Sequence, residues 1–403
     1  MNRIFRLISP APLGVRIRSR ECFTYLYRVV MFVGYTPPKR DVQRYLYLFW
    51  SCLVFTIAEL YAPVGLVLSL IKNFSNFTPG DFFNVLQVTF NVSGATAKTI
   101  VVLFLFSRIN QMESVLDIMD ERLRRDDDRC RIHKAVADSN YIFLVYAIIY
   151  GTFLTSAFVI GVFNGHPPWL FYNPLFDWHN GSTRFWLQSI LEQIVVSLTG
   201  LTLLVSDTYP LIFLVMMRAH IDVLRERIRS LRTDLHKTEA ENYDELICCI
   251  MDHKLILKCC AIMRPIISGI IFVHFQLVGV VLGVTIINIL YFSDFIHGIS
   301  SIIYLTGILL ESFPCCYLSD LLAEDSKDLS NLLAQSNWIS AERKYKSTLM
   351  IFIQHVQRPI VFVAGIIFPI SVNSNIRMAR FAFSVMTIVQ QMNLADRLKK
   401  VTR

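Results

Sequence analysis

The chain has 403 residues, and its composition is that of a protein whose solvent is largely lipid. Hydrophobic residues make up 54% of the sequence and charged residues 17%, and 30 residues are Phe. Because soluble domains carry roughly 25% charged residues, this composition excludes a disordered chain and argues against a soluble enzyme. The formal net charge is +8. Since Lys and Arg fill the gaps between apolar runs and form no basic face, we expect no nucleic-acid partner.

Seven stretches are long and apolar enough for membrane-spanning helices, which need about 20 mainly apolar residues. The predicted spans are Tyr45–Ile71, Phe82–Phe106, Tyr141–Phe163, Trp186–Met217, Ile266–Tyr291, Ile299–Leu318 and Ser374–Met392. Ahead of them, Tyr25–Tyr35 is apolar but is interrupted by Arg28, so we expect a short helix beneath the bundle. The predicted fold is an all-α membrane protein with seven transmembrane helices.

The basic residues predict how the chain is oriented in the membrane. Cytoplasmic loops carry an excess of Lys and Arg, and most of the 39 basic residues lie on the same side as the amino terminus. The amino terminus is therefore expected in the cytoplasm and the carboxyl terminus outside the cell. Three glycosylation sequons agree, because Asn73, Asn76 and Asn180 all fall in loops predicted to be external.

The seventh predicted span carries a polar stripe along one helical face. Arg380, Ser384, Thr387 and Gln391 follow one another at helical spacing. In lipid such a stripe must face water or other polar groups, and lining a water path is the favoured interpretation over polar packing. Ile388, beside the stripe, is a candidate apolar constriction. Because one helix cannot enclose a pore, a water path implies several subunits around a symmetry axis.

The connector between the fourth and fifth spans is predicted to be helical and not a flexible loop. Ile221, Leu224, Ile228 and Leu231 recur at three- and four-residue spacing, and a break is expected near Thr238–Tyr243. These helices would extend the spans into the cytoplasm. Their apolar seam would either pack within the chain or contact another subunit, and the sequence leaves both interpretations open.

Several classes of function are disfavoured by the motifs. The pairs Cys248-Cys249 and Cys259-Cys260 lack CxxC spacing, so we expect no metal site. Nucleotide-binding and hydrolase motifs are missing, so neither a cofactor nor an enzymatic activity is expected. A G-protein-coupled receptor has the opposite orientation, and a secondary transporter would favour internal repeats. Both classes remain as alternatives.

The chain resembles the insect odorant receptors, specifically the odour-tuned subunits of flies. The similarity runs over essentially the whole length, and its most specific segments are NFTPGDFFNVLQVTFNV (76–92), HPPWLFYNPLFDW (166–178), SDTYPLIFLVMMRAH (206–220), MDHKLILKCC (251–260), SNWISAERKYKSTLMIFIQHVQRPIVFVAGIIFPISVNSN (336–375) and FAFSVMTIVQQMN (381–393). The resemblance implies a heterotetramer with an odorant co-receptor subunit that conducts cations when a small volatile odorant binds. Ser384 and Val385 depart from the Thr-Tyr pair typical of the superfamily. A gustatory-type homomeric channel is the nearest alternative.

The resemblance also implies where the odorant binds, namely among the outer halves of the second to sixth helices. The residues that it points to here are Thr89, Val92, Ser93, Phe153, Ser156, Ile160, Ile194, Ser197 and Tyr304. They are apolar or weakly polar, which suits a ligand held by shape and dispersion. Lys98, Glu192 and Asp207 are too charged for a neutral volatile molecule, so we expect them to satisfy buried polar groups or to contact water.

These inferences divide the chain along its length. The predicted parts are a cytoplasmic and interfacial segment (1–44), transmembrane helices one to four (45–217), a cytoplasmic helical connector (218–264), helices five and six (265–318), a cytoplasmic anchor region (319–373), a pore-lining seventh helix (374–392) and an extracellular tail (393–403). The expected location is the plasma membrane of olfactory sensory neuron dendrites.

Overall fold

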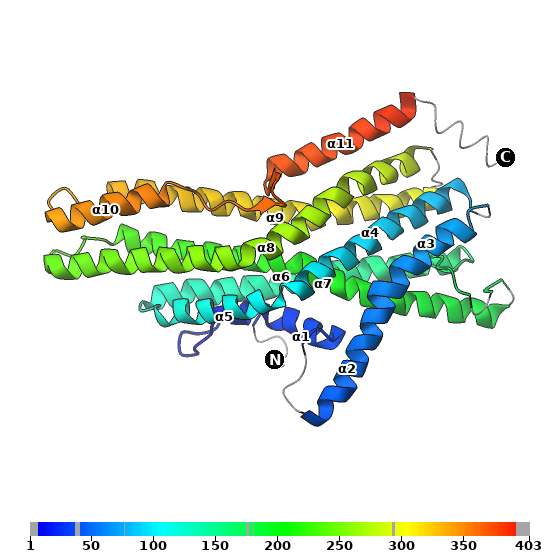
Figure 1. Cartoon of the computed structure of the whole chain (residues 1–403), viewed down its shortest axis with the longest axis horizontal. Coiled ribbons are helices and arrows are strands. Elements are labelled where there is room, and N and C mark those ends of the chain that lie inside the picture. Colours follow the sequence, from blue (N-terminus) through cyan, green and yellow to red (C-terminus); the bar gives the residue numbers. More distant parts are fainter. Residues whose placement is uncertain are drawn as a thin grey trace.

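The computed structural model of the chain is a long bundle of helices (Figure 1). It describes residues 7–36, 41–75, 77–174, 177–179, 181–291 and 295–391. Nearly all of these residues are helical, and two short strands pair antiparallel just before the last helix. The all-α class predicted from the sequence is confirmed.

The helices differ widely in length, and several are much longer than a bilayer is thick. In chain order the elements are η1 (Ser19–Phe23), α1 (Thr24–Val33), α2 (Asp41–Phe55), η2 (Thr56–Tyr61), α3 (Ala62–Lys72), α4 (Pro79–Phe104), α5 (Phe106–Glu121), α6 (Asp126–Phe163), α7 (Ser182–Arg229), α8 (Glu239–Tyr291), α9 (Phe295–Gln335), α10 (Arg343–Val356), β1 (Val363–Ala364), β2 (Phe368–Pro369) and α11 (Val372–Gln391). The short helix expected near Tyr25–Tyr35 is α1.

Among the described residues, four helical segments are long and apolar enough to cross a membrane. They are Arg44–Lys72, Asp126–Phe163, Ser182–Arg229 and Glu239–Ile289, and they contain the first, third and fourth predicted spans and most of the fifth. The sixth and seventh predicted spans coincide with parts of α9 and α11, where many side chains lie outside the described residues.

The second predicted span is bent where the sequence predicted a single helix to Phe106. Here α4 ends at Phe104, and α5 leaves at an angle of 59° to it, so the two count as a fifth span only if taken together. Leu105 joins them. The bend separates the apolar α4 from the more polar α5, which turns to pack against α8.

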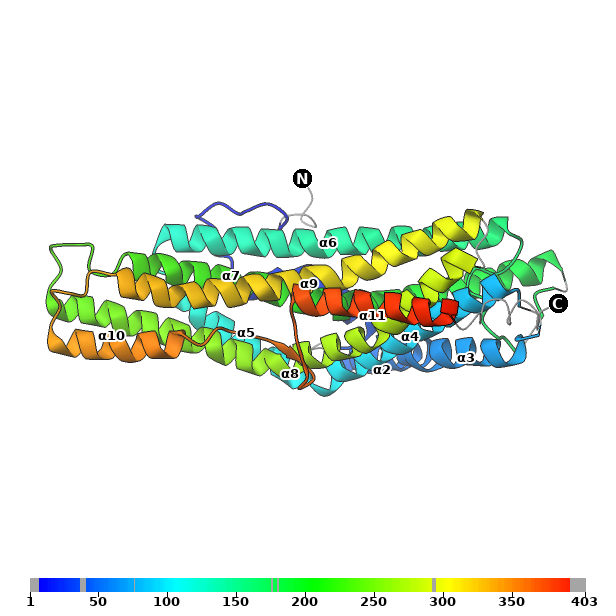
Figure 2. The ribbon, with the colours of Figure 1, turned by 90° about the horizontal axis from the view of Figure 1, so that it is seen from above.

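The largest buried core lies toward the end of the bundle where α7, α8, α9 and α10 extend together, at the left in Figures 1 and 2. The apolar seam predicted in the connector is part of this core, because Ile221, Leu224 and Ile228 are buried there. Burying such a seam removes apolar surface from water, at about 25 cal/mol per Å². This part of the connector therefore packs within its own chain.

The break in the connector was predicted slightly too late in the chain. The helix α7 ends at Arg229 and α8 begins at Glu239, so Tyr243 is already helical. Thr238 and Glu241 fix this start as a capping box. The Thr238 hydroxyl accepts a hydrogen bond from the Glu241 amide (3.3 Å), and the Glu241 carboxylate accepts one from the Thr238 amide (2.8 Å).

Ion pairs hold the extended helices to one another. Arg227 of α7 bonds to Asp128 of α6 at 2.9 Å and to Asp252 of α8 at 2.5 Å. Arg225, two residues earlier, bonds to Asp325 and Asp328 of α9. Because both arginines are in α7, this helix is joined by ion pairs to α6, α8 and α9.

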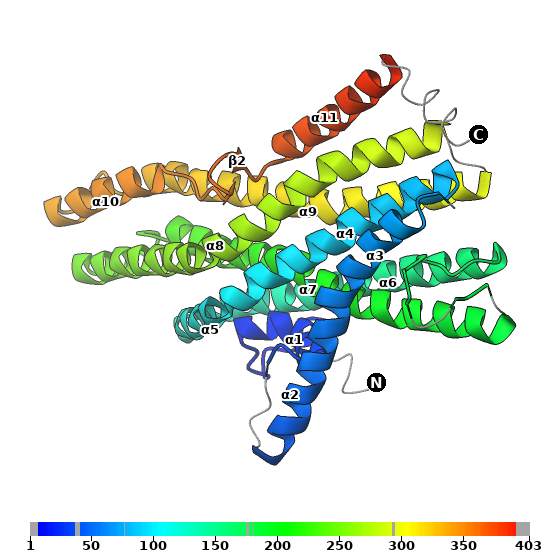
Figure 3. The ribbon, with the colours of Figure 1, turned by 45° about the vertical axis from the view of Figure 1, so that its right-hand side comes forward.

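The last helix leans away from the bundle and lies next to α8 (Figure 3). Its first turn is nevertheless tied to α9. The amide of Val372 donates to the Asp320 carboxylate at 2.8 Å, and the Asn375 side chain donates to the Ser312 hydroxyl at 3.1 Å. Helix α11 is therefore anchored at its beginning, and described side chains farther along it, such as Arg380 and Phe383, are exposed.

Candidate functional site

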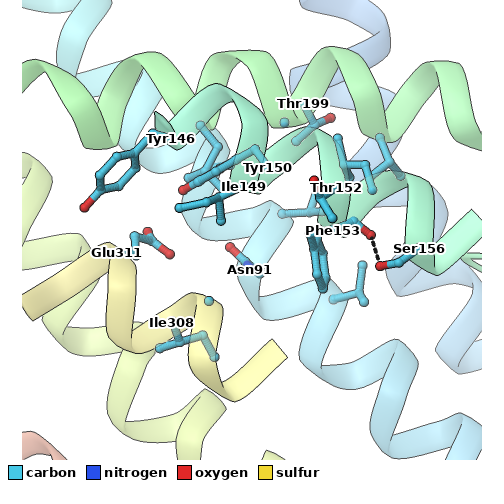
Figure 4. Close-up of a pocket in the computed structure, with 18 of the residues that line it drawn as sticks. Asn91, Tyr146, Ile149, Tyr150, Thr152, Phe153, Ser156, Thr199, Ile308 and Glu311 are labelled. Atoms are coloured by element: carbon cyan, nitrogen blue, oxygen red, sulfur yellow. Dashed lines mark hydrogen bonds between the residues drawn. The ribbon is translucent and has the colours of Figure 1, made fainter. Parts of the chain in front are cut away.

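A cavity of about 540 Å³ lies between α4, α6, α7 and α9 (Figure 4). Its wall is mainly apolar and includes Val92, Ala95, Phe153, Val196, Leu203 and Ile308. A cavity of this size, apolar with a few polar groups, is typical of a site for a small organic molecule. The space is defined by four helices that are far apart in the sequence, so its shape depends on how they are held together.

One end of the cavity is closed by the segment that connects α6 and α7. Trp169 lines the cavity, and its ring packs beside Phe153 with centroids 6.3 Å apart. Three successive backbone amides, of Trp169, Leu170 and Phe171, donate to the carboxylate of Glu192 at 2.8 to 3.1 Å. Leu170 has a left-handed φ of 54°, and Glu192 stabilises this backbone conformation by satisfying all three amides.

The other end of the cavity abuts a buried network of charged groups. Lys98 of α4 donates to Asp207 of α7 at 2.8 Å and also bonds to Glu311 of α9. His274 of α8 lies 3.1 Å from the Lys98 ammonium and 2.9 Å from a Glu311 oxygen, both measured from its Nδ1. The Tyr150 hydroxyl of α6 donates to Asp207 at 2.7 Å. Side chains from five helices thus form one network around the Lys98 ammonium.

Three groups of the same network have the residue types of metal ligands. One ligand atom each from Asp207, His274 and Glu311 lies within 4.8 Å of the others, a spacing that could suit a cation. However, the Lys98 ammonium is within hydrogen-bond distance of all three groups. Because the position between them is taken by a cation of the chain itself, these residues do not fit a metal ion.

The structure distributes the predicted odorant residues over several environments. Val92, Phe153 and Ser156 line the cavity, whereas Ile160 lines a smaller adjacent hollow. Thr89 is buried and bonds to its own helix. Ser93, Ile194 and Ser197 are outside the cavity lining, and Ser93 and Ile194 face outward. The side chain of Tyr304 lies outside the described residues. The described residues of this set thus lie on helices that border the cavity, but only some of them line it.

Of the residues that line the cavity, the sequence reasoning singled out only Val92, Phe153 and Ser156 as ligand contacts. Asn91, Tyr146, Tyr150 and Trp169 border the cavity. Asn91 begins an Asn-Val-Ser sequon, but it lies within the second predicted span. A polar side chain inside a membrane helix is costly unless it serves a purpose, and this signal points to Asn91 and to Glu311, whose charge in the sixth predicted span was visible in the sequence.

The predicted stripe on α11 is exposed in the single chain. Arg380, Ser384, Thr387 and Gln391 are all exposed, and the Ser384 and Thr387 hydroxyls donate to carbonyls one turn earlier in the helix. The side chain of Ile388 lies outside the described residues. Phe381 and Phe383 are 54% and 57% exposed. These described side chains are therefore available for contacts beyond the chain.

The external sequons are described only in part. Asn73 follows the end of α3 and is half-buried. Asn76 and Asn180 lie outside the described residues, so all three glycosylation sites stay predictions.

Comparison with known proteins decides the family. The family model described as 7tm Odorant receptor matches residues 78–383. Odorant receptor 59b of Drosophila melanogaster is 50% identical over 397 residues, which is 98% of this chain and 100% of that protein. Odorant receptor 42b of the same fly is 46% identical and covers 98% of this chain and 99% of its own.

This chain belongs to the odorant receptor family. The resemblance inferred from its motifs is confirmed, and the relatives are receptors, not enzymes. Among solved structures, the insect olfactory receptor OR5 from Machilis hrabei superposes with a TM-score of 0.75 and covers 93% of this chain and 98% of its own. At 15% identity this likeness shows a shared fold. With its apolar helices, the receptor is a multi-pass membrane protein.

The charged network yields a first prediction for this receptor. Lys98→Met leaves Asp207 and Glu311 buried without their cation, which costs roughly 3–5 kcal/mol, a large part of a typical stability of about 5–15 kcal/mol. We expect little monodisperse receptor in fluorescence-detected size-exclusion chromatography. The triple variant Lys98→Met, Asp207→Asn, Glu311→Gln removes all three charges and should recover most of the protein. A single Lys98→Met receptor as stable as the wild type would contradict this account.

The closed end of the cavity yields a second prediction. Glu192→Ala leaves three backbone amides without their acceptor, so the segment should open more often. Hydrogen exchange at Trp169–Phe171 should accelerate at least about tenfold. Gln193→Leu is the matched control, since it removes the 3.3 Å bonds to the Trp169 indole and to the Leu154 carbonyl but leaves the three amides bonded to Glu192. Equal exchange in the two variants would show that Glu192 does not hold the segment.

Proposed function

We propose that this receptor is the odour-binding subunit of a heteromeric, odour-gated cation channel that works with an obligate co-receptor. Its place would be the dendritic plasma membrane of olfactory sensory neurons, with the amino terminus in the cytoplasm and the carboxyl terminus outside. The observation that carries the proposal is the cavity, which four helices and Trp169 border. Its apolar wall suits a volatile molecule held by shape and dispersion.

The relatives support the proposed ligand class. Each of the fly proteins is named an odorant receptor. A second solved structure of the Machilis hrabei receptor, described as a complex with eugenol, superposes with a TM-score of 0.69 at 16% identity. A small organic ligand is therefore compatible with this fold, and the cavity offers a place for one in the present chain.

The exposed stripe of α11 supports the channel part of the proposal. A hydroxyl and amide stripe facing lipid would be costly, whereas the same stripe facing a water path between subunits would be satisfied. Closed symmetry around an axis is the usual way in which one helix per subunit builds such a path. In this arrangement Arg380, Ser384, Thr387 and Gln391 would line the conduit and Ile388 would narrow it.

Ligand binding would open the path by selecting one of two arrangements of the helices. A ligand shifts such an equilibrium only by its differential affinity for the two states. Occupation of the cavity would stabilise the arrangement in which the α11 helices stand apart.

Two neighbouring residues of α4 test whether the cavity is the odorant site. Val92→Phe fills part of the cavity, whereas Ser93→Phe adds the same ring on the exposed face of the helix. In cells that also express the co-receptor, Val92→Phe should raise the half-maximal odorant concentration about tenfold or more, which is about 1.4 kcal/mol. Ser93→Phe should leave it within about threefold.

The same recordings separate a channel from other receptors. The odour-evoked cation current should persist when G-protein signalling is blocked, and it should require the co-receptor. Loss of the current under the block would favour a G-protein-coupled receptor, and a current without the co-receptor would favour a gustatory-type homomer.

Cysteine substitutions on α11 test the water path. Ser384→Cys and Thr387→Cys should become targets of a water-soluble thiol reagent while odorant is present, so that the current falls by at least about half. Val389→Cys lies on the opposite side of the helix by its spacing in the sequence, and it should respond no more than the wild type. A reagent effect at Val389 alone would place the wrong face of α11 on the path.

A further inference from the structure

Three hydroxyl groups of the cavity share one property, which is that their protons are already used inside the protein. The Ser156 hydroxyl donates to the Phe153 carbonyl at 2.8 Å, and the Thr306 hydroxyl donates to the Ile302 carbonyl at 2.9 Å. The Thr199 hydroxyl donates to the Val195 carbonyl at 3.1 Å. Each hydroxyl therefore turns lone pairs, not a proton, toward the cavity. A ligand in this space meets more acceptors than donors.

Glu311 is the strongest of these acceptors. Its Oε1 atom bonds to Lys98 and His274, and its side chain is 8% exposed. Among the described residues, Oε2 has no hydrogen-bond partner, and Glu311 borders the cavity opposite Asn91 (Figure 4). A buried carboxylate oxygen gains most from a hydrogen-bond donor, because bonds to charged groups are about twice as strong as neutral ones.

The charge balance of the network favours the same kind of ligand. Two carboxylates, of Asp207 and Glu311, share the one ammonium of Lys98. The Tyr150 hydroxyl donates to Asp207 and adds no charge. With a neutral His274 the network keeps one excess negative charge, and Glu311 brings it to the cavity wall. A ligand proton placed there is attracted, whereas a ligand oxygen is repelled.

The geometry points to a ligand class: this receptor selects small molecules that carry an O–H or N–H donor, with Glu311 Oε2 accepting the proton. The Asn91 amide lies across the same part of the cavity and can bond to the oxygen or nitrogen of the same group. Alcohols and phenols, or the ammonium of a small amine, supply this donor. Ethers and esters of equal size do not. The assignment rests on the proposed function of the cavity.

The test compares ligands that differ in the donor and little else. Hexanol and methyl pentyl ether have the same atoms, and phenol and anisole differ by one methyl group. We expect each alcohol to act at a concentration about tenfold or more below that of its ether. Hexylamine is compared with hexanol to show whether an ammonium group or a hydroxyl is the better donor to Glu311. Both the odour-evoked current and the thermal stabilisation of the purified receptor are measured.

Two variants assign the selectivity to one residue. Glu311→Gln keeps the size of the side chain, removes the charge, and leaves Lys98 paired with Asp207, so the receptor should still fold. The preference for alcohol over ether should fall to within about threefold. Thr306→Val is the matched control. Thr306 lines the same cavity on the same helix, but its hydroxyl donates to the Ile302 carbonyl. Its preference should remain that of the wild type.

The outcomes separate this inference from the proposed function. Ethers and esters that act as well as alcohols on the wild type would overturn the donor rule, even if Glu311→Gln failed to reach the membrane. An unchanged preference in a folded Glu311→Gln receptor would overturn the role of Glu311. Selective stabilisation by alcohols without any current would instead leave the ligand class standing and remove the channel.

Discussion

The structure depends on the need to pair charges inside a membrane protein. A lone ammonium or carboxylate within the bilayer is costly, and Lys98, Asp207 and Glu311 remove the cost for one another. Each of the four helices that border the cavity contributes a group to this network, α6 through the Tyr150 hydroxyl. The helices cannot separate without leaving a charge unpaired. The same interaction that holds the bundle together therefore fixes the shape of the cavity.

A second polar anchor lies at the opposite end of the cavity and works by a different principle. Within the described parts of the chain, Glu192 has no cation partner and accepts hydrogen bonds from backbone amides and the side chain of Gln188. The Glu192 carboxylate fixes the conformation of the segment between α6 and α7, whereas the Lys98 network connects helices to one another. The cavity wall between these two polar groups is mainly apolar, so a ligand would contact it mainly through dispersion.

The sequence predicted the class and most of the helices because the signals are local. Apolar runs of sufficient length gave the spans, and the periodic connector gave the helices that bury Ile221 and Leu224. The bend at Leu105 was missed because neither a proline nor a glycine marks it. The break before α8 was placed too late because the Thr-x-x-Glu capping box was not recognised.

The site was harder to predict because it depends on which face of each helix turns inward. Val92 and Ser93 are neighbours, yet one lines the cavity and the other faces outward. Composition alone does not separate them. The charged residues carried more information, since Lys98, Glu192 and Asp207 were expected to satisfy buried polar needs and do so. Their partners, Glu311 and the amides of Trp169–Phe171, come from segments far away in the sequence and are identified only in the folded chain.

Two consecutive residues of α9 connect the cavity to the last helix. Glu311 borders the cavity, and Ser312 beside it holds Asn375 at the base of α11. A helix is stiff along its axis, so a small rotation or slide of α9 moves both residues at once. The bond between Ser312 and Asn375 would then transmit this movement to the base of α11. The rest of α11 would move with its base. A displacement of a fraction of an ångström beside the ligand would be magnified at the far tip.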